Sequence, residues 1–159
     1  MLGLVLLDNT VLSNLALVGQ ADLVFHVWPE GVASTPQVLS EYGMAARAGL
    51  LPPQAWADLP LVALTSQELT LSETFSQRLG QGERSCLAVA HLRGGVFASD
   101  DADARAAARR LGVPVTGTLG ILALAVHRDL VTLAQANAVL ANMVAAGYRS
   151  PVERLDDLV

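Results

Sequence analysis

Residues 3–17 read GLVLLDNTVLSNLAL, a short apolar run that ends in an aspartate and passes at once into a helical pattern. We predict a buried strand over Gly3–Leu7 and a helix over Thr10–Leu17, with Asp8 at the junction. A strand that leads directly into a helix is typical of βαβ units, which build parallel sheets. Ligand sites in such sheets form beyond the carboxyl ends of the strands, where Asp8 stands.

The same alternation of short apolar runs and longer helical patterns continues along the chain. Further strands are predicted at Gly31–Ala33, Leu61–Leu64, Gly95–Ala98 and Val113–Thr116. Further helices are predicted at Pro36–Ala48, Ser66–Phe75, Gly82–Leu92, Ala102–Leu111, Gly117–His127 and Leu133–Ala146. The sequence therefore predicts an α/β domain with three α/β/α layers and a mostly parallel sheet of four or five strands.

Composition limits the class of protein. With 159 residues, of which 52% are hydrophobic and 16% charged, the chain is long and apolar enough for one domain with a substantial core. The net charge of −5 argues against non-specific adhesion to nucleic acid or anionic membranes, although a bound metal would reverse the local field. The lone Cys86 is expected in the core, and the absence of a signal peptide or spanning segment predicts a cytoplasmic location.

Four further acids occur where a strand should pass into a helix, or on a nearby helix. They are Glu41 in PQVLSEYG, Glu83 in GQGERSCLAVA, and Asp100 and Asp101 in VFASDDADAR. The Asp100–Asp101 pair would lie beside Asp8 if the first and fourth predicted strands are adjacent. A fold that gathers these acids at one sheet edge would form a carboxylate pocket suited to a divalent cation.

Each acid also has a structural interpretation. Asp8, or one residue of the Asp100–Asp101 pair, can cap a helix, and Glu83 can complement the dipole of a first helical turn. Glu41 lies beside apolar positions in the middle of its helix, too far in to cap it, which leaves a solvated border residue as the alternative. Side chains that point apart would favour capping, whereas converging carboxylates would favour a metal site.

The stretches LLDNTVLSNL, VLSEY, GQGERSCLAVA, ASDDADAR and VPVTGTLGILALA resemble PIN-domain proteins. The resemblance is greatest to the small prokaryotic branch related to VapC-type toxin ribonucleases. It covers residues 3–127, and its distinctive pieces are the Gly-Glu of GQGE and the Gly-Thr-Leu-Gly of VTGTLG. Residues 128–159 resemble the helical tail of that branch. We therefore expect a PIN-like nuclease domain over 1–127 and a C-terminal helical extension of the same domain over 128–159.

The resemblance implies a metal-dependent endoribonuclease that uses Mg²⁺ or Mn²⁺ and leaves a 5′-phosphate and a 3′-hydroxyl. Asp8, Glu41 and Glu83 match the first three acids of the family, and the fourth falls on Asp100 or Asp101, so both stay candidates. We expect the metal ligands among Asp8, Asp100, Asp101 and Glu83, with Glu41 or Glu83 as an alternative orienter of the attacking water. The resemblance further implies an RNA substrate, a cognate antitoxin and a homodimer.

Two kinds of side chain are candidates for holding RNA. Thr10 or Ser13 matches the small polar residue of the family and could offer a hydroxyl to water or phosphate, as could Thr118; the alternative for each is a capping group. The guanidinium fork suits phosphate oxygens, although a solvated helix face is the alternative for each arginine. The arginine candidates near the expected site are Arg84, Arg105 and Arg47.

Several other chemistries lack the residues that they need. All 10 basic residues are Arg, which argues against response-regulator receivers and haloacid-dehalogenase-type phosphatases, because both use a lysine. The spacing of GQGERS fits neither a Walker A loop nor a dinucleotide fingerprint. His26, His91 and His127 form no ligand-spaced cluster, which argues against a zinc site.

A protein of another class is the main alternative: a catalytically silent PIN-like module that only binds a partner or assembles. In that case the acids would be caps or remnants. Its support is the apolar tail formed by Leu133, Val139, Leu140, Met143 and Val144, which could provide an oligomer or partner surface.

Overall fold

The computed structural model describes residues 3–159 and contains one four-stranded sheet in the order β2-β1-β3-β4. All three pairings are parallel. The strands are short: β1 Val5–Leu7, β2 Val32–Ala33, β3 Val96–Ala98 and β4 Val115–Thr116. The α/β class and the parallel sheet are thus confirmed, with the first and fourth predicted strands, β1 and β3, as direct neighbours.

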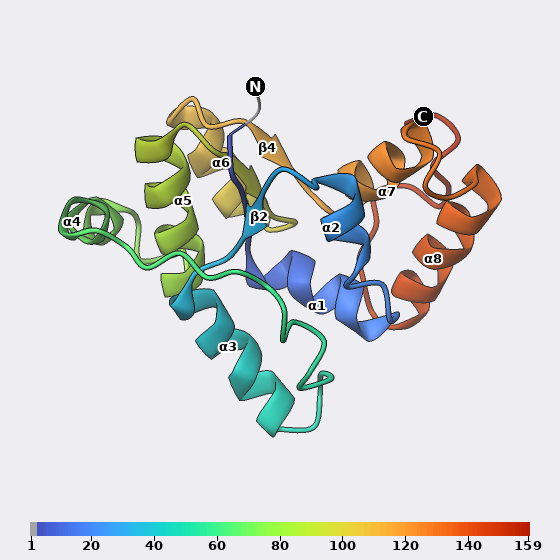
Figure 1. Cartoon of the computed structure of the whole chain (residues 1–159), viewed down its shortest axis with the longest axis horizontal. Coiled ribbons are helices and arrows are strands. Elements are labelled where there is room, and N and C mark those ends of the chain that lie inside the picture. The colour runs from blue at the N-terminus through green and yellow to red at the C-terminus, as the bar shows by residue number, and fades with distance from the viewer. Residues whose placement is uncertain (1–2) are drawn as a thin grey trace.

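Eight helices surround the sheet in the described part of the chain. They are α1 Asn9–Leu17, α2 Leu23–Val27, α3 Pro36–Arg47, α4 Ser66–Thr74, α5 Gln81–Arg93, α6 Ala102–Arg110, α7 Thr118–His127 and α8 Leu133–Ala145. Helix α5 packs against β1 and β3 and is covered by α3 and α4, whereas α7 packs against α1, α2 and α8 (Figure 1). The sheet therefore lies inside a three-layer arrangement, as predicted.

Two local predictions differ from the structure. The expected strand Leu61–Leu64 is wrong, because only Leu61 forms an isolated parallel bridge, with Ser34. The neighbouring strand β2 is two residues long, so it offers no longer edge for a fifth strand to pair with. The helix α2 was not predicted; its five residues are too few to give a helical period, and burial of Val24 and Val27 holds it.

Local signals explain where the longer helices begin and end. The Thr35 hydroxyl accepts the Val38 amide at 3.2 Å and starts α3, with Pro36 in the first turn. Gly94 adopts a left-handed conformation with φ of 68° and ends α5, which turns the chain back toward β3. All three residues of β1 are buried, as the continuous apolar run of a central parallel strand requires.

The C-terminal helix contributes to the core of the same chain. Leu140 and Met143 on α8 are buried, as is Leu155 beyond it. The apolar tail therefore packs largely inside the molecule, which weakens its use as support for a partner surface. The boundary expected at residue 127 stays a prediction. No helix among residues 3–159 is both long and apolar enough to cross a membrane.

Candidate active site

Two of the acidic segments meet at the C-terminal ends of β1 and β3. Asp8 follows β1 directly, and residues 99–101 follow β3, with Leu7 opposite Ala98 in the ladder. The Asp8 amide donates a hydrogen bond to the Ala98 carbonyl at 3.0 Å. The sheet edge that the sequence predicts as a ligand site thus brings Asp8 beside the Asp100–Asp101 pair.

Asp8 is fully buried and accepts hydrogen bonds through both carboxylate oxygens. Its Oδ1 caps α1 by accepting the Thr10 amide at 3.0 Å and the Val11 amide at 3.3 Å, and it also accepts the Thr10 hydroxyl at 2.5 Å. Its Oδ2 accepts the Ser99 hydroxyl at 2.5 Å. Burial raises the pKa of Asp8 to about 6 against the effect of these bonds, and the charge of Asp100 adds to the rise.

Asp100 is the centre of a second hydrogen-bond network that joins β3 to α1 and α7. The Asp100 amide donates to Thr10 Oγ1 at 2.9 Å, so one threonine links the two acids. Asp100 Oδ1 accepts the Thr118 amide at 2.8 Å, at the start of α7. Its Oδ2 accepts Asn14 Nδ2 at 2.8 Å and also the Thr118 hydroxyl. These contacts fix the direction of the Asp100 carboxylate.

Asp101 and Glu83 form the other side of the site. Asp101 Oδ2 caps α6 by accepting the Ala104 amide at 2.8 Å. Glu83 lies in the first turn of α5, and its Oε2 is buried with no hydrogen-bond donor among residues 3–159. Desolvation raises the pKa of Glu83 to about 8, with the charges of Asp101 and Asp8 adding to the rise and the Gly80 backbone opposing it.

Glu41 reaches the same region from α3. Its Oε1 accepts the Gly82 amide at 2.8 Å, so Glu41 caps the first turn of α5 rather than its own helix. A Cβ on Gly82 would lie 3.0 Å from both Glu41 oxygens, so the glycine allows this close approach. A Cβ on Gly80 would lie 3.4 Å from Glu41 Oε1 and 3.5 Å from Glu83 Oε1. The two carboxylates therefore both lie next to Gly80.

Capping and clustering are therefore not alternatives in this molecule. Asp8, Glu41, Asp100 and Asp101 each accept a backbone N–H from the first turn of a different helix. The four helices begin at one edge of the sheet, which is why their caps lie near one another. Among residues 3–159, however, no three His, Cys, Asp or Glu side chains converge as a ready-made set of metal ligands.

The predicted hydroxyl groups fall into two places. Thr10 and Thr118 belong to the hydrogen-bond networks of Asp8 and Asp100. Ser13 lies one turn along α1, where its hydroxyl is 3.5 Å from Asn9 Oδ1. The structure thus places Thr10, rather than Ser13, between the acids.

The three candidate arginines also differ in position. Arg105 Nη1 donates to the Ser99 and Thr116 carbonyls at 2.8 and 2.9 Å, which places the guanidinium beside Asp100. Arg84 and Gln37 line a cavity of about 220 Å³, and neither the buried Nε of Arg84 nor the Oε1 of Gln37 has a hydrogen-bond partner in the described residues. Arg47 ends α3, which extends away from the sheet (Figure 1), and it is not brought to the site.

Two side chains of the site were missed from the sequence. Ser99 joins Asp8 to Asp101, because its hydroxyl donates to Asp8 and accepts the Asp101 amide at 3.1 Å. Asn14 holds Asp100, and it lies one helical turn after Thr10 on the same face of α1. The four-residue spacing from Thr10 is a weak signal for Asn14, because Asn9 and Ser13 on the same helix show the same spacing.

Comparison with known proteins agrees with this geometry. A family model described as a PIN domain (DUF3368) matches residues 4–159. The chain belongs to this PIN-domain family. PIN domains are generally nucleases that use divalent metal ions, so a nuclease-type fold follows from the match. Searches of curated proteins and of solved structures gave no significant match.

The residues of this PIN domain are suited to such an ion. The donor set consists of carboxylate oxygens, which Mg²⁺ and Mn²⁺ prefer. Glu83 Oε2 is buried without a donor, and the pKa values of Glu83 and Asp8 are raised, mainly by burial and further by the charges of neighbouring acids. A cation at this edge would offset both the missing hydrogen bond and the repulsion.

Proposed function

We propose that this PIN domain is a metal-dependent endoribonuclease that hydrolyses RNA phosphodiesters as the toxin of a toxin–antitoxin pair. Asp8, Asp100, Asp101 and Glu83 would hold Mg²⁺ or Mn²⁺. The observation that carries the proposal is the buried, donor-free Oε2 of Glu83 beside the charges of Asp101 and Asp8. In that environment the charged carboxylate destabilises the protein, so that Glu83 holds a proton near neutral pH unless a cation binds it, and such a shifted pKa is typical of a functional site.

The neighbouring residues would divide the remaining work. A bound ion would supply a water of lowered pKa and positive charge to offset the negative charge of the phosphate. The hydroxyls of Ser99 and Thr10 hold Asp8 from both oxygens, and Asn14 and Thr118 hold Asp100. Glu41 would orient the attacking water, and its bond to the Gly82 amide and its position beside Glu83 support that role.

A silent binding module is the second candidate. The observation in its favour is that four acids already serve as helix caps, so each has a structural reason to be present. It leaves the unpartnered Glu83 oxygen without explanation. The two functions differ in what removal of one charge does, because capping survives the change from Asp to Asn whereas metal-dependent cleavage does not.

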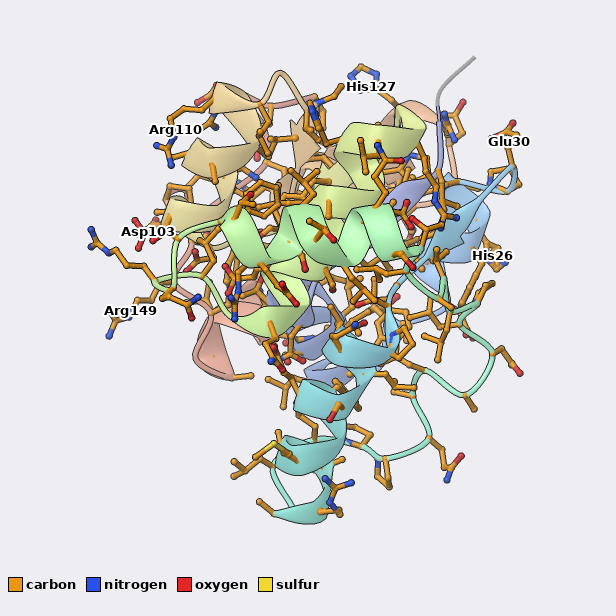
Figure 2. All side chains as sticks on the ribbon, turned by 90° about the vertical axis from the view of Figure 1, so that its left-hand side faces the viewer. His26, Glu30, Asp103, Arg110, His127 and Arg149 are labelled. Atoms are coloured by element: carbon orange, nitrogen blue, oxygen red, sulfur yellow. The ribbon has the colours of Figure 1, made fainter. Side chains whose placement is uncertain are left out.

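The deciding experiment compares Asp8→Asn with Asp103→Asn in Mn²⁺-dependent cleavage of single-stranded and structured RNA. Asn keeps the cap of α1, so the fold should persist while cleavage falls about a hundredfold or more. Asp103 is an exposed acid in the first turn of α6, shown in Figure 2, and its substitution should leave the rate unchanged. Absence of metal-dependent cleavage by the unaltered protein, with Asp8→Asn indistinguishable from it, would favour the binding module.

The toxin role, with its antitoxin and homodimer, rests on the resemblance to the VapC-type branch and needs a separate test. Induced expression of the unaltered protein in a bacterial host should arrest growth, and expression of Asp8→Asn at the same level should not. Equal growth of both strains would argue against a toxin while leaving the nuclease proposal standing.

A further inference from the structure

A second feature lies next to the acids, on the side of Asp100. It is a cavity of about 350 Å³, near the lower end of the about 300–1,000 Å³ typical of ligand sites, and so large enough for one nucleotide unit. The wall comes from the start of α6, the β4–α7 junction and the chain after α8. Its main lining residues are Asp100, Arg105, Gly117, Gly120, Tyr148 and Arg149.

The wall formed by residues 148–151 is anchored from both sides. Gly147 takes a φ of 113°, which turns the chain back after α8, and the Tyr148 amide donates to the Met143 carbonyl at 3.0 Å. Further along, the Leu155 amide donates to Asn137 Oδ1 at 2.7 Å, and the Leu155 side chain is buried. The cavity is therefore built into the fold.

The chemistry of the lining suits a phosphate and an aromatic ring. Arg105 is fixed beside Asp100 by its two carbonyl contacts, whereas Arg149 is exposed and projects from the surface (Figure 2). Tyr148 is half-buried, and its pKa is raised to about 12 by burial and the charge of Asp100, against Arg105, so the phenol stays neutral. A neutral aromatic ring beside two cations provides both stacking and charge neutralisation.

The Gly-Thr-Leu-Gly motif of residues 117–120 gains a role from this cavity. A Cβ on Gly117 would lie 2.6 Å from Asp100 Oδ1 and 2.9 Å from Arg105 Nη1, so a side chain there would displace the acid or the arginine. A Cβ on Gly120 would collide with the Thr116 hydroxyl. Gly117 thus allows Asp100 and Arg105 their positions in the cavity wall, and Gly120 allows the Thr116 hydroxyl its position.

We propose that this cavity is the subsite for the nucleotide next to the scissile phosphodiester, with Tyr148 stacking on its base and Arg149 binding its phosphate. The inference rests on the proposed ribonuclease function and deepens it. It follows from the position of the cavity, which shares Asp100 with the acid site, and from the cation–aromatic pair on its outer wall. Tyr148 and Arg149 are positioning residues, because they lie outside the set of acids.

Binding without cleavage tests the subsite first. The probe is a fluorescent single-stranded RNA oligonucleotide, titrated in Mg²⁺ with Asp8→Asn protein so that it is not cut. Added Tyr148→Leu or Arg149→Gln should each weaken binding about five- to fiftyfold, and Tyr148→Phe should keep it because the ring remains. Arg110→Gln, at an exposed arginine on the last turn of α6, is the matched control and should change nothing. Equal binding by all variants would overturn the proposal.

Cleavage kinetics in the unaltered background separate the subsite from the chemistry. Arg149→Gln and Tyr148→Leu should raise KM and leave kcat within about twofold, since they position substrate away from the reacting bond. A loss confined to kcat, or unchanged KM in a protein that cleaves RNA, would overturn the subsite and spare the proposed function. RNA binding that depends on Tyr148 and Arg149 in a protein that cleaves no RNA would sustain the subsite and overturn the ribonuclease proposal.

Discussion

The two ends of α5 place a glutamate in opposite environments. At the C-terminal end, Arg93 donates to both oxygens of Glu68 on α4, at 2.6 and 2.8 Å. These bonds, and the Thr65 contacts of the capping box, lower the pKa of Glu68 to about 2. At the N-terminal end, Glu83 has a buried oxygen with no donor among the described residues, and its pKa is raised to about 8.

The difference shows what a carboxylate needs in order to be structural. Glu68 is buried and Glu83 is half-buried with one buried oxygen, but Glu68 receives a guanidinium and a backbone N–H in return. Glu83 has the Gly80 backbone in its favour but no cation, and it lies beside the negative charges of Asp101 and Asp8. A side chain that destabilises the folded state in this way is better explained by function than by packing.

The largest expected difference between Glu83 and Glu68 is in the rate of RNA cleavage. Glu83→Gln should lower Mn²⁺-dependent RNA cleavage about a hundredfold or more, because it removes a charge that would bind the ion. Glu68→Gln should leave the rate within about twofold, because the ion pair lies at the other end of α5. Equal losses in both variants, measured on RNA at saturating Mn²⁺, would contradict the assignment of Glu83 to the site.

The next largest effect concerns stability at the opposite end of the helix. Arg93→Ala should cost about 2–3 kcal/mol of unfolding free energy, because it leaves the buried Glu68 carboxylate without its partner. Adding Glu68→Gln should recover part of that loss. Glu83→Gln without metal at pH 8 or above should instead stabilise the protein, since it removes a negative charge that lies beside those of Asp101 and Asp8. Urea unfolding of the four proteins measures all three values.

The two ends of the chain's site region also show which features could be predicted from the sequence: local ones could, and contacts between distant segments could not. The junction of strand, Asp8 and helix was predictable because it is local: an apolar run, a capping acid and a helical period. The partner of Glu41 was not predictable, because the amide of Gly82 reaches it only through the packing of α3 on α5. The predicted strand Leu61–Leu64 is wrong for a similarly non-local reason. Strand formation there depends on pairing with β2, which is too short to extend the pairing beyond Leu61.

The pH dependence of stability should have opposite signs for the two kinds of acid. The folded-state pKa of Glu83, about 8, and of Asp8, about 6, lie above the ordinary values of 4.5 and 3.8, so the folded protein retains protons that the unfolded chain has lost. In EDTA, stability should therefore fall as pH rises from about 4.5 to about 8. The contribution of Glu68 should be fully present above 4.5 and be lost as pH falls toward 2.

Bound metal should counteract the loss of folding stability at alkaline pH. Millimolar Mn²⁺ at pH 8 should raise the melting temperature by about 2–6 °C, because only the folded protein holds the carboxylates together. Glu83→Gln should show both a flatter pH profile in EDTA and a smaller response to Mn²⁺. A melting temperature that is independent of pH in EDTA and of Mn²⁺ would mean that these acids serve as helix caps and do not destabilise the folded protein.

The smallest expected change in stability comes from Gly82→Ala, within the first turn of α5. Alanine favours a helix over glycine by about 0.5–1 kcal/mol, but its Cβ would press against both Glu41 oxygens at 3.0 Å and Val38 Cγ2 at 2.9 Å. The two effects nearly cancel, so unfolding free energy should change by less than about 1 kcal/mol. Glu41 must nevertheless give up its bond to the Gly82 amide, and RNA cleavage should fall. Gly43→Ala is the matched control, because the added methyl would approach only the flexible, exposed end of Arg47. If Gly82→Ala retained full activity, Glu41 would be a cap of α5 and nothing more, and the site would rest on Asp8, Glu83 and the Asp100–Asp101 pair.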